Sequence, residues 1–232
     1  MSRPVLRVRD LRAGYDAIRV LGGLDLDVEP GEIVGVAGLN GTGKTTLLRA
    51  LSGMINRSCD VALLNGAPLP ARPHAVARRG LVHVPEGRRV FPNLTVRDNL
   101  RYGAVAAGHS GRAAAAAAIL EIFPPLAALS QRRAGLLSGG EQQMLAVARG
   151  LMARPILLMV DELSLGLSPR ASKDIATVLA QAARDRGLSL LLVDQNVALL
   201  QSHCDRILTI RDGRARSVAG RLDHDAIDAA YF

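Results

Sequence analysis

Hydrophobic residues follow two kinds of pattern along this chain, and each kind predicts a different sort of β-strand. Residues 5–8 and 24–28 alternate aliphatic and polar side chains, which is typical of half-buried antiparallel strands. Residues 33–37, 156–160 and 188–193 are continuous apolar runs followed by polar or glycine-containing turns, as in parallel strands buried on both faces. We therefore expect an antiparallel edge sheet beside a parallel sheet, with helices between its strands.

The pattern changes in the middle of the chain and again near its end. Residues 95–135 lack a strand pattern and are rich in alanine, the best intrinsic helix former, so a small helical subdomain is expected there. Residues 206–210 and 214–219 flank the turn Asp212-Gly213 and predict a hairpin. A short helix over residues 223–231 is expected to follow.

These elements predict one domain over residues 1–232. Its core, with the edge sheet, is expected to comprise residues 1–94 and 136–232, and residues 95–135 form the helical insertion. No apolar run reaches the roughly 18–20 residues of a membrane span, so we expect the chain in the cytoplasm. Cys59 and Cys204 are too few for a disulfide framework and are expected to be buried small residues.

The formal net charge of +8 raises the possibility of a nucleic-acid partner. The arginines, however, are spread in singles and pairs without a basic run, which is typical of a solvated surface. The net charge alone therefore does not indicate a nucleic-acid partner.

Residues 38–46, Gly-Leu-Asn-Gly-Thr-Gly-Lys-Thr-Thr, follow an apolar strand and precede a leucine-rich segment. The sequence fits the phosphate-loop pattern G-x-x-x-x-G-K-[ST], in which curled backbone N–H groups and a helix N-terminus face phosphate oxygens. Lys44 is expected to reach the β- and γ-phosphates, and the Thr45 hydroxyl to bind Mg²⁺. We expect nucleotide contacts from Gly38, Asn40, Gly41, Gly43, Lys44, Thr45 and Thr46.

A second motif lies at residues 156–162, where an apolar strand ends in Asp161-Glu162. Asp161 at such a strand end can hold Mg²⁺ through water, and Glu162 can orient or deprotonate an attacking water. An acidic helix cap would explain the pair in isolation, but the phosphate loop favours the catalytic interpretation.

The third motif is Leu-Ser-Gly-Gly-Glu-Gln-Gln at residues 137–143. Ser138 and Glu141 fit a capping box at a helix start, and the exposed N–H groups there make a second anion site. The motif resembles the signature of ABC-transporter ATPases. The resemblance covers essentially the whole chain and implies an α/β fold: a P-loop NTPase (RecA-like) core with an antiparallel β edge sheet and an inserted helical subdomain.

The resemblance also implies ATP and Mg²⁺ as cofactors and a site shared between two subunits. The facing subunit would close its signature over the γ-phosphate, through Ser138, Gly139, Gly140 and Gln142. Tyr15 stands where the family has the aromatic residue that stacks on adenine, although alone it would be read as a core tyrosine. Glu86 stands where the family has a metal-contacting glutamine.

Three segments resemble one subfamily, the second ATPase subunit of branched-chain amino acid importers. They are Pro-Glu-Gly-Arg-Arg-Val-Phe at 85–91, the segment 161–167, and Asp-Gln-Asn at 194–196. Gln195 stands where most ABC ATPases have a catalytic histidine; it can donate a hydrogen bond but cannot carry charge, which favours slow hydrolysis. Leu163 replaces the proline that usually follows Glu162.

The resemblance implies a peripheral protein at the cytoplasmic face of the inner membrane. Its partners would be membrane-spanning permease subunits, a paralogous ATPase or a second copy of itself, and indirectly an extracytoplasmic substrate-binding protein. Phe91 is expected to be exposed in a groove for a helix of the permease; burial in the core is the alternative.

Three other functions stay open: a urea or short-chain amide importer ATPase, a soluble nucleic-acid-associated ABC ATPase, and a nearly inactive regulatory subunit.

Overall fold

A six-stranded sheet forms the centre of the computed structural model, which describes residues 3–106 and 112–218. The strand order is β11-β10-β3-β9-β8-β7, and neighbours are parallel except for the antiparallel pair β10 and β11. The strands are β3 (Ile33–Ala37), β7 (Leu81–Val84), β8 (Leu157–Asp161), β9 (Ser189–Asp194), β10 (Arg206–Arg211) and β11 (Arg214–Val218). The three apolar runs correspond to β3, β8 and β9, so the predicted parallel strands and the hairpin are confirmed.

An antiparallel sheet lies beside this central sheet, with strand order β2-β1-β5-β6 and β4 paired to β1. Its strands are β1 (Leu6–Tyr15), β2 (Ile18–Val28), β4 (Arg57–Ser58), β5 (Val61–Leu64) and β6 (Ala67–Pro68). The predicted alternating strands are therefore confirmed as parts of β1 and β2. The sequence pattern did not predict β4 to β7, because each has only two to four residues and mostly half-buried side chains.

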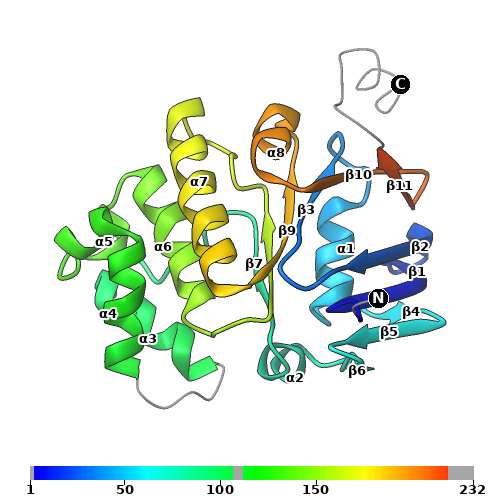
Figure 1. Ribbon diagram of the computed structural model, residues 1–232, viewed down its shortest axis with the longest axis horizontal. Helices are drawn as coiled ribbons and strands as arrows, with labels where there is room; N and C mark the ends of the chain where they lie inside the picture. Colours follow the sequence, from blue (N-terminus) through cyan, green and yellow to red (C-terminus); the bar gives the residue numbers. More distant parts are fainter. Residues whose placement is uncertain (1–2, 107–111, 219–232) are drawn as a thin grey trace.

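Helices cover both faces of the central sheet (Figure 1). They are α1 (Lys44–Leu51), α2 (Pro73–Arg78), α3 (Val96–Ala106), α4 (Arg112–Ile122), α5 (Pro124–Ala128), α6 (Gly139–Leu151), α7 (Pro169–Arg186) and α8 (Val197–His203). Alternate residues of β8 divide between two cores: Leu158 and Val160 pack with α6 and α7, whereas Leu157 and Met159 pack with α1 and the antiparallel sheet. This two-sided burial explains why the central strands are apolar at every position.

At one end of the molecule, α3 and α5 pack against α6, and α4 packs against α3 and α5 (Figure 1). Their buried residues Leu100 and Phe123 belong to the same core as Val160 of the central sheet. Because this core is continuous, the boundaries of the helical insertion at 95 and 135 stay a prediction. The helix expected over residues 223–231 lies outside the described residues.

The two cysteines differ from the expectation. Cys59 and Cys204 are both only half-buried, so the prediction that they are buried small residues was wrong in degree. Cys204 lies at the end of α8, where its sulfur packs beside Gly35 of β3. Cys204 therefore packs against the hydrophobic core between α8 and the central sheet.

Candidate nucleotide-binding site

The sequence motifs converge at one edge of the central sheet because β3, β9 and β8 are adjacent and parallel. Ala37 at the end of β3 is paired with Asp194, and Val193 is paired with Asp161. The segments that follow these strands therefore leave the sheet side by side. They carry the phosphate loop, Glu162 and Gln195.

The phosphate loop has a backbone that only glycine adopts readily. Gly41 and Gly43 have φ angles of +83° and +104°, in the left-handed region. Gly43 is the N-cap of α1, and no side chain caps that end of the helix. The first N–H groups of α1 are thus left for an anion, as a phosphate-binding loop requires.

Lys44 is buried, with 4% of its side chain exposed, and already faces the loop. Its Nζ donates to the carbonyl oxygens of Gly38 and Leu39, at 2.7 and 2.9 Å. The same nitrogen lies 3.4 Å from Oε1 of Glu162. The ammonium group is therefore held where phosphate oxygens would enter, between the loop and the acidic pair.

Asp161 and Thr45 supply oxygen atoms that fit a magnesium ion. The Thr45 hydroxyl lies 3.4 Å from Oδ1 of Asp161, and Oδ2 of Asp161 is buried without a hydrogen-bond partner. The described residues contain no cluster of three His, Cys, Asp or Glu side chains that could hold a metal alone. Mg²⁺ suits such a sparse site, because it is commonly held by one or two carboxylates, water and substrate phosphates.

Glu162 lies at the centre of a small polar cluster. Gln195 Nε2 donates to both of its carboxylate oxygens, at 3.3 and 3.2 Å, and to Oδ1 of Asn40 at 2.7 Å. These groups line a cavity of about 350 Å³ together with Tyr15, Val20, Gly41, Gly43, Lys44, Thr45, Thr46, Glu86 and Leu165. A base, a cation and an amide thus converge on one space, as phosphoryl transfer to water requires.

A family model described as ABC transporter matches residues 21–164, which include the phosphate loop, the signature and the acidic pair. The chain belongs to the ABC transporter family. It is 39% identical over 201 residues to the high-affinity branched-chain amino acid transport ATP-binding protein BraG of Pseudomonas aeruginosa, covering 86% of each chain. It is 36% identical over 219 residues to the probable branched-chain amino acid transport ATP-binding protein LivF of Archaeoglobus fulgidus, covering 94% of this chain and 90% of that one.

Solved structures show the same ABC fold. The ADP conformation of an ATP-binding cassette of an ABC transporter has a TM-score of 0.84 at 21% identity, covering 98% of both chains. The ATP-binding subunit of an ABC transporter has a TM-score of 0.78 at 27% identity, covering 92% of this chain and 90% of that one. The predicted fold class is confirmed, and the chain is an ATPase of the ABC type.

Tyr15 and Glu86 line the same cavity as Lys44. Tyr15 is 38% exposed, and its hydroxyl accepts a hydrogen bond of 3.1 Å from Arg49. Arg49 also lies over one face of the ring, with its Cζ 6.0 Å from the ring centroid, so Arg49 holds the ring at its polar end and on that face. This geometry is compatible with stacking on adenine, which stays a prediction, as does metal binding by Glu86.

The ABC signature is the start of α6, and its capping box is formed as expected. Ser138 Oγ accepts from the Glu141 N–H, and the Glu141 carboxylate accepts from the Ser138 N–H. Gln142 bonds within its own chain, donating to the carbonyl oxygens of Ala134 and Leu137. None of residues 138–142 lines the cavity around Lys44, so any contact with a nucleotide there needs a second subunit.

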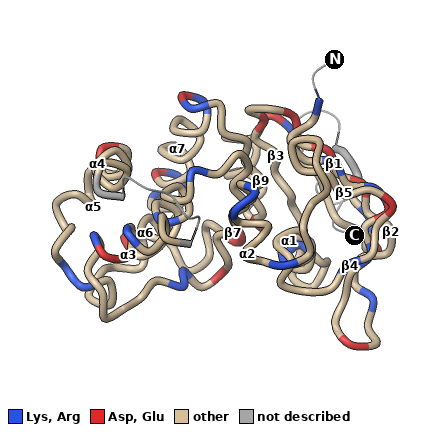
Figure 2. The backbone as a smooth tube through the Cα atoms, turned by 90° about the horizontal axis from the view of Figure 1, so that it is seen from below, with Lys and Arg blue, Asp and Glu red and all other residues tan. Residues whose placement is uncertain are grey.

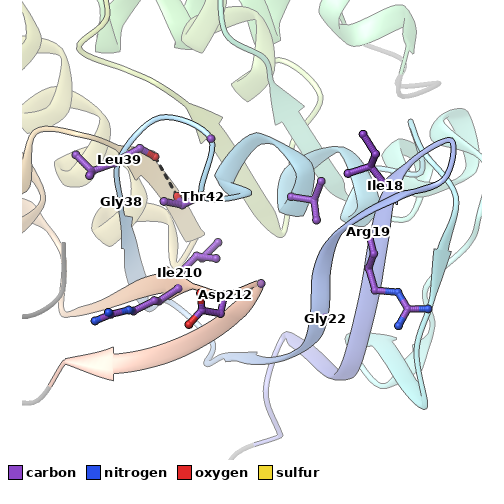
Figure 3. Close-up of a pocket in the computed structure, with 12 residues that line it drawn as sticks. Ile18, Arg19, Gly22, Gly38, Leu39, Thr42, Ile210 and Asp212 are labelled. Carbon is purple, nitrogen blue, oxygen red and sulfur yellow. Dashed lines mark hydrogen bonds between the residues drawn. The ribbon is translucent and has the colours of Figure 1, made fainter. Parts of the chain in front are cut away.

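A larger cavity of about 640 Å³ lies beside the phosphate loop (Figure 3). The start of β2, the phosphate loop, and the end of β10 with its turn into β11 contribute its walls, including Arg19, Thr42 and Asp212. Lys44, Asp161 and Glu162 do not line it. We therefore assign the chemistry to the smaller cavity.

Sequence reasoning did not assign roles to Asp194, Ser164 and Arg49. Asp194 ends an apolar strand, as Asp161 does, and this common position was an available signal. Arg49 gave no signal, because a basic residue in the last turn of a helix is common.

Replacing Asp161 with Asn is expected to stabilise the nucleotide-free protein. Burial raises the pKa of Asp161 from 3.8 to about 6, so above pH 6 the folded state holds a costly buried carboxylate. Stability from this group therefore rises as the pH falls through 6. We expect Asp161→Asn to melt about 5 °C higher than the wild type at pH 8, and about half as much higher at pH 5.

The measurement is thermal denaturation without nucleotide at both pH values, with Asp174→Asn on the exposed surface of α7 as the control. A variant that melts below the wild type at pH 8 would show that the buried Asp161 carboxylate does not destabilise the folded protein.

Proposed function

We propose that this chain is the ATP-hydrolysing subunit of an importer for branched-chain amino acids. The observation that carries the hydrolytic part is the contact of Glu162 with both Lys44 and Gln195 inside one cavity. The cargo rests on the two relatives named for branched-chain amino acid transport, at 39% and 36% identity. The cargo itself would be bound by other subunits, so this part is analogy.

In this proposal, ATP enters along the phosphate loop. The N–H groups of α1 and the Lys44 ammonium bind the β- and γ-phosphates, so Nζ moves from the carbonyl oxygens of Gly38 and Leu39 to the nucleotide. Asp161 and Thr45 would hold Mg²⁺, with Glu86 beside them. An ion held there would supply positive charge to the phosphate oxygens.

Glu162 orients the attacking water and accepts its proton, because its carboxylate faces the cavity beside Lys44. Gln195 holds that carboxylate in place and can donate to the γ-phosphate. The water oxygen forms the new bond to phosphorus as the bond to the β-phosphate oxygen breaks, giving ADP and phosphate.

Closure of two subunits supplies the second anion site. Residues 138–140 of a facing subunit, at the capped start of α6, would bind the γ-phosphate that Lys44 holds. Shifting the ratio of closed to open pairs from 1:99 to 99:1 requires that ATP bind the closed pair more favourably by about 5.5 kcal/mol, which two shared nucleotides can supply. Hydrolysis then removes the phosphate that joins the halves. The facing subunit is a paralogous ATPase or a second copy.

An apolar groove offers a docking surface for the membrane subunits. It has a volume of about 560 Å³ and is lined mostly by residues of β7, α3 and α6. Phe91 is 47% exposed at its edge, as expected, and packs against Tyr102 with ring centroids 5.7 Å apart. Among the described residues no helix is long and apolar enough to cross a bilayer. We propose that the permease holds the chain at the cytoplasmic face of the inner membrane through this groove.

Phe91→Ala is expected to uncouple hydrolysis from transport. Loss of a large aromatic side chain that anchors an interface costs about 2 kcal/mol, which is about 30-fold in affinity for the permease. Basal ATP hydrolysis should stay unchanged, because Phe91 does not line the catalytic cavity. Co-purification with the permease and transport in proteoliposomes measure the effect, with Arg186→Ala on the exposed end of α7 as control. Unchanged transport would contradict the docking assignment.

The whole proposal is tested by reconstitution with permease subunits, the paralogous ATPase and the substrate-binding protein. Leucine, isoleucine or valine on the binding protein should stimulate ATP hydrolysis and accumulate inside the vesicles. Stimulation by urea or a short-chain amide instead would favour the alternative cargo.

A soluble ABC ATPase acting on nucleic acid is the alternative from a different class. Figure 2 shows basic and acidic segments interspersed over the backbone, without a continuous basic stripe in the described part of the chain. Binding to DNA with an affinity that falls steeply as the salt concentration rises would favour this alternative.

A further inference from the structure

Asp194 joins the two turns that carry Glu162 and Gln195. Its side chain is buried at the end of β9, with 1% of the residue exposed. Oδ1 accepts hydrogen bonds from the Ser164 hydroxyl at 2.6 Å and from the Asn196 N–H at 2.8 Å, and Oδ2 accepts from the Ser164 N–H at 2.9 Å. One carboxylate thus ties the turn after β8 to the turn after β9.

The tied segment holds Glu162 in an unusual backbone conformation. Its φ angle is +50°, in the left-handed region that non-glycine residues adopt only at a cost. Such conformations persist when the surrounding structure holds them, and they gather at active sites. Here the Glu162 N–H donates to the Val193 carbonyl at 2.8 Å, and Ser164, two residues later, is fixed by Asp194.

The residue after Glu162 does not supply this restraint. Leu163 is buried, but unlike proline it leaves both its own φ and the preceding residue free to change. On the carboxyl side of Glu162 the chain is instead held by the hydrogen bonds of Ser164 to Asp194, together with the Leu165 N–H, which donates to the Glu162 carbonyl oxygen at 3.3 Å. Gln195, which follows Asp194 directly, is fixed by the same carboxylate through Asn196.

We propose that Asp194 and Ser164 form a positioning pair that keeps the Glu162 carboxylate and the Gln195 amide in register for water attack. Neither residue lines the cavity around Lys44, so the pair acts through Glu162. This inference rests on the proposed hydrolysis at Glu162.

Ser164→Ala is expected to lower kcat for ATP about 10-fold and to leave KM for ATP within about twofold, because small displacements of a catalytic group slow the reaction strongly. Asp194→Asn should lower kcat further. An amide has one oxygen for three incoming donors, so one or more of the N–H and O–H groups would face the NH₂ group.

Two further variants separate positioning from folding. Ser164→Thr keeps the hydroxyl and should restore most of the lost kcat. Ser189→Ala is the matched control: Ser189 is a buried serine at the other end of β9, whose hydroxyl donates to the Glu29 carbonyl at 3.1 Å. It should leave kcat unchanged even if it lowers the melting temperature as much as Ser164→Ala does.

The deciding experiment compares Ser164→Ala in two backgrounds, with steady-state kinetics of the closed ATPase pair. Beside the wild-type Glu162 it should cost about 10-fold in kcat; beside Glu162→Gln it should cost nothing more, because a residue acting through Glu162 has no effect once that group is gone. Equal losses in both backgrounds, or no loss in either while Glu162→Gln is inactive, would overturn the positioning pair. Full activity of Glu162→Gln itself would instead refute the proposed hydrolysis.

Discussion

Glutamine in place of Glu162 is expected to lower the turnover of ATP hydrolysis by at least about 100-fold, the usual contribution of a positioned general base. The amide keeps the size of the side chain but cannot accept the proton of the attacking water. ATP binding should persist, because the phosphate loop and Lys44 are unchanged. Phosphate release measures turnover, and equilibrium binding of ATP measures affinity.

The same variant is expected to trap the closed pair of subunits. Without hydrolysis, the γ-phosphate continues to join the phosphate loop of one subunit to residues 138–140 of the other. The solution mass with and without Mg-ATP reports this state. A shift from monomer to dimer identifies a homodimer, whereas a monomer that still binds ATP indicates an obligatory paralogous partner. Glu121→Gln, on the exposed surface of α4, is the control for loss of an acid elsewhere.

Turnover within about threefold of the wild type in Glu162→Gln would contradict the assignment of Glu162. It would also leave the contact between Glu162 and Gln195 without a catalytic purpose. The question of a slow, regulatory subunit is separate and is addressed by Gln195→His: no change in turnover would count against it.

Lys44→Ala is expected to weaken ATP binding by at least about 100-fold. Two charge-assisted hydrogen bonds to phosphate oxygens are lost, and each contributes about 1.5–3 kcal/mol. The nucleotide-free protein should also become less stable by about 3 kcal/mol. Its buried ion pair with Glu162 is broken, and the carbonyl oxygens of Gly38 and Leu39 lose their donor.

Equilibrium ATP binding and denaturant unfolding measure the two effects of Lys44→Ala separately. The chain provides a matched control, because its two lysines are Lys44 and Lys173, and the second is exposed on α7. Lys173→Ala should change neither quantity. Wild-type affinity in Lys44→Ala would show that the nucleotide binds somewhere other than the phosphate loop.

Much of the fold and of the candidate site could be predicted from local patterns. The apolar runs of β3, β8 and β9 are continuous because both faces of the central sheet are covered. The motif around Lys44 directly follows such a strand, and Asp161 ends another, so their placement followed from the strand prediction. The capping box of Ser138 and Glu141 spans three residues and needs no distant partner.

What the sequence by itself determined is therefore local: the strand and helix types, the phosphate loop, the acidic strand end and the signature cap. Only the tertiary structure decided which of these meet. The order β3-β9-β8 brings Gln195 onto Glu162 and Asn40, places Asp194 against Ser164, and leaves Phe91 at the edge of an apolar groove. The physical reason is that periodicity records whether a side chain is buried, whereas strand order and side-chain partners depend on packing between segments far apart in the chain.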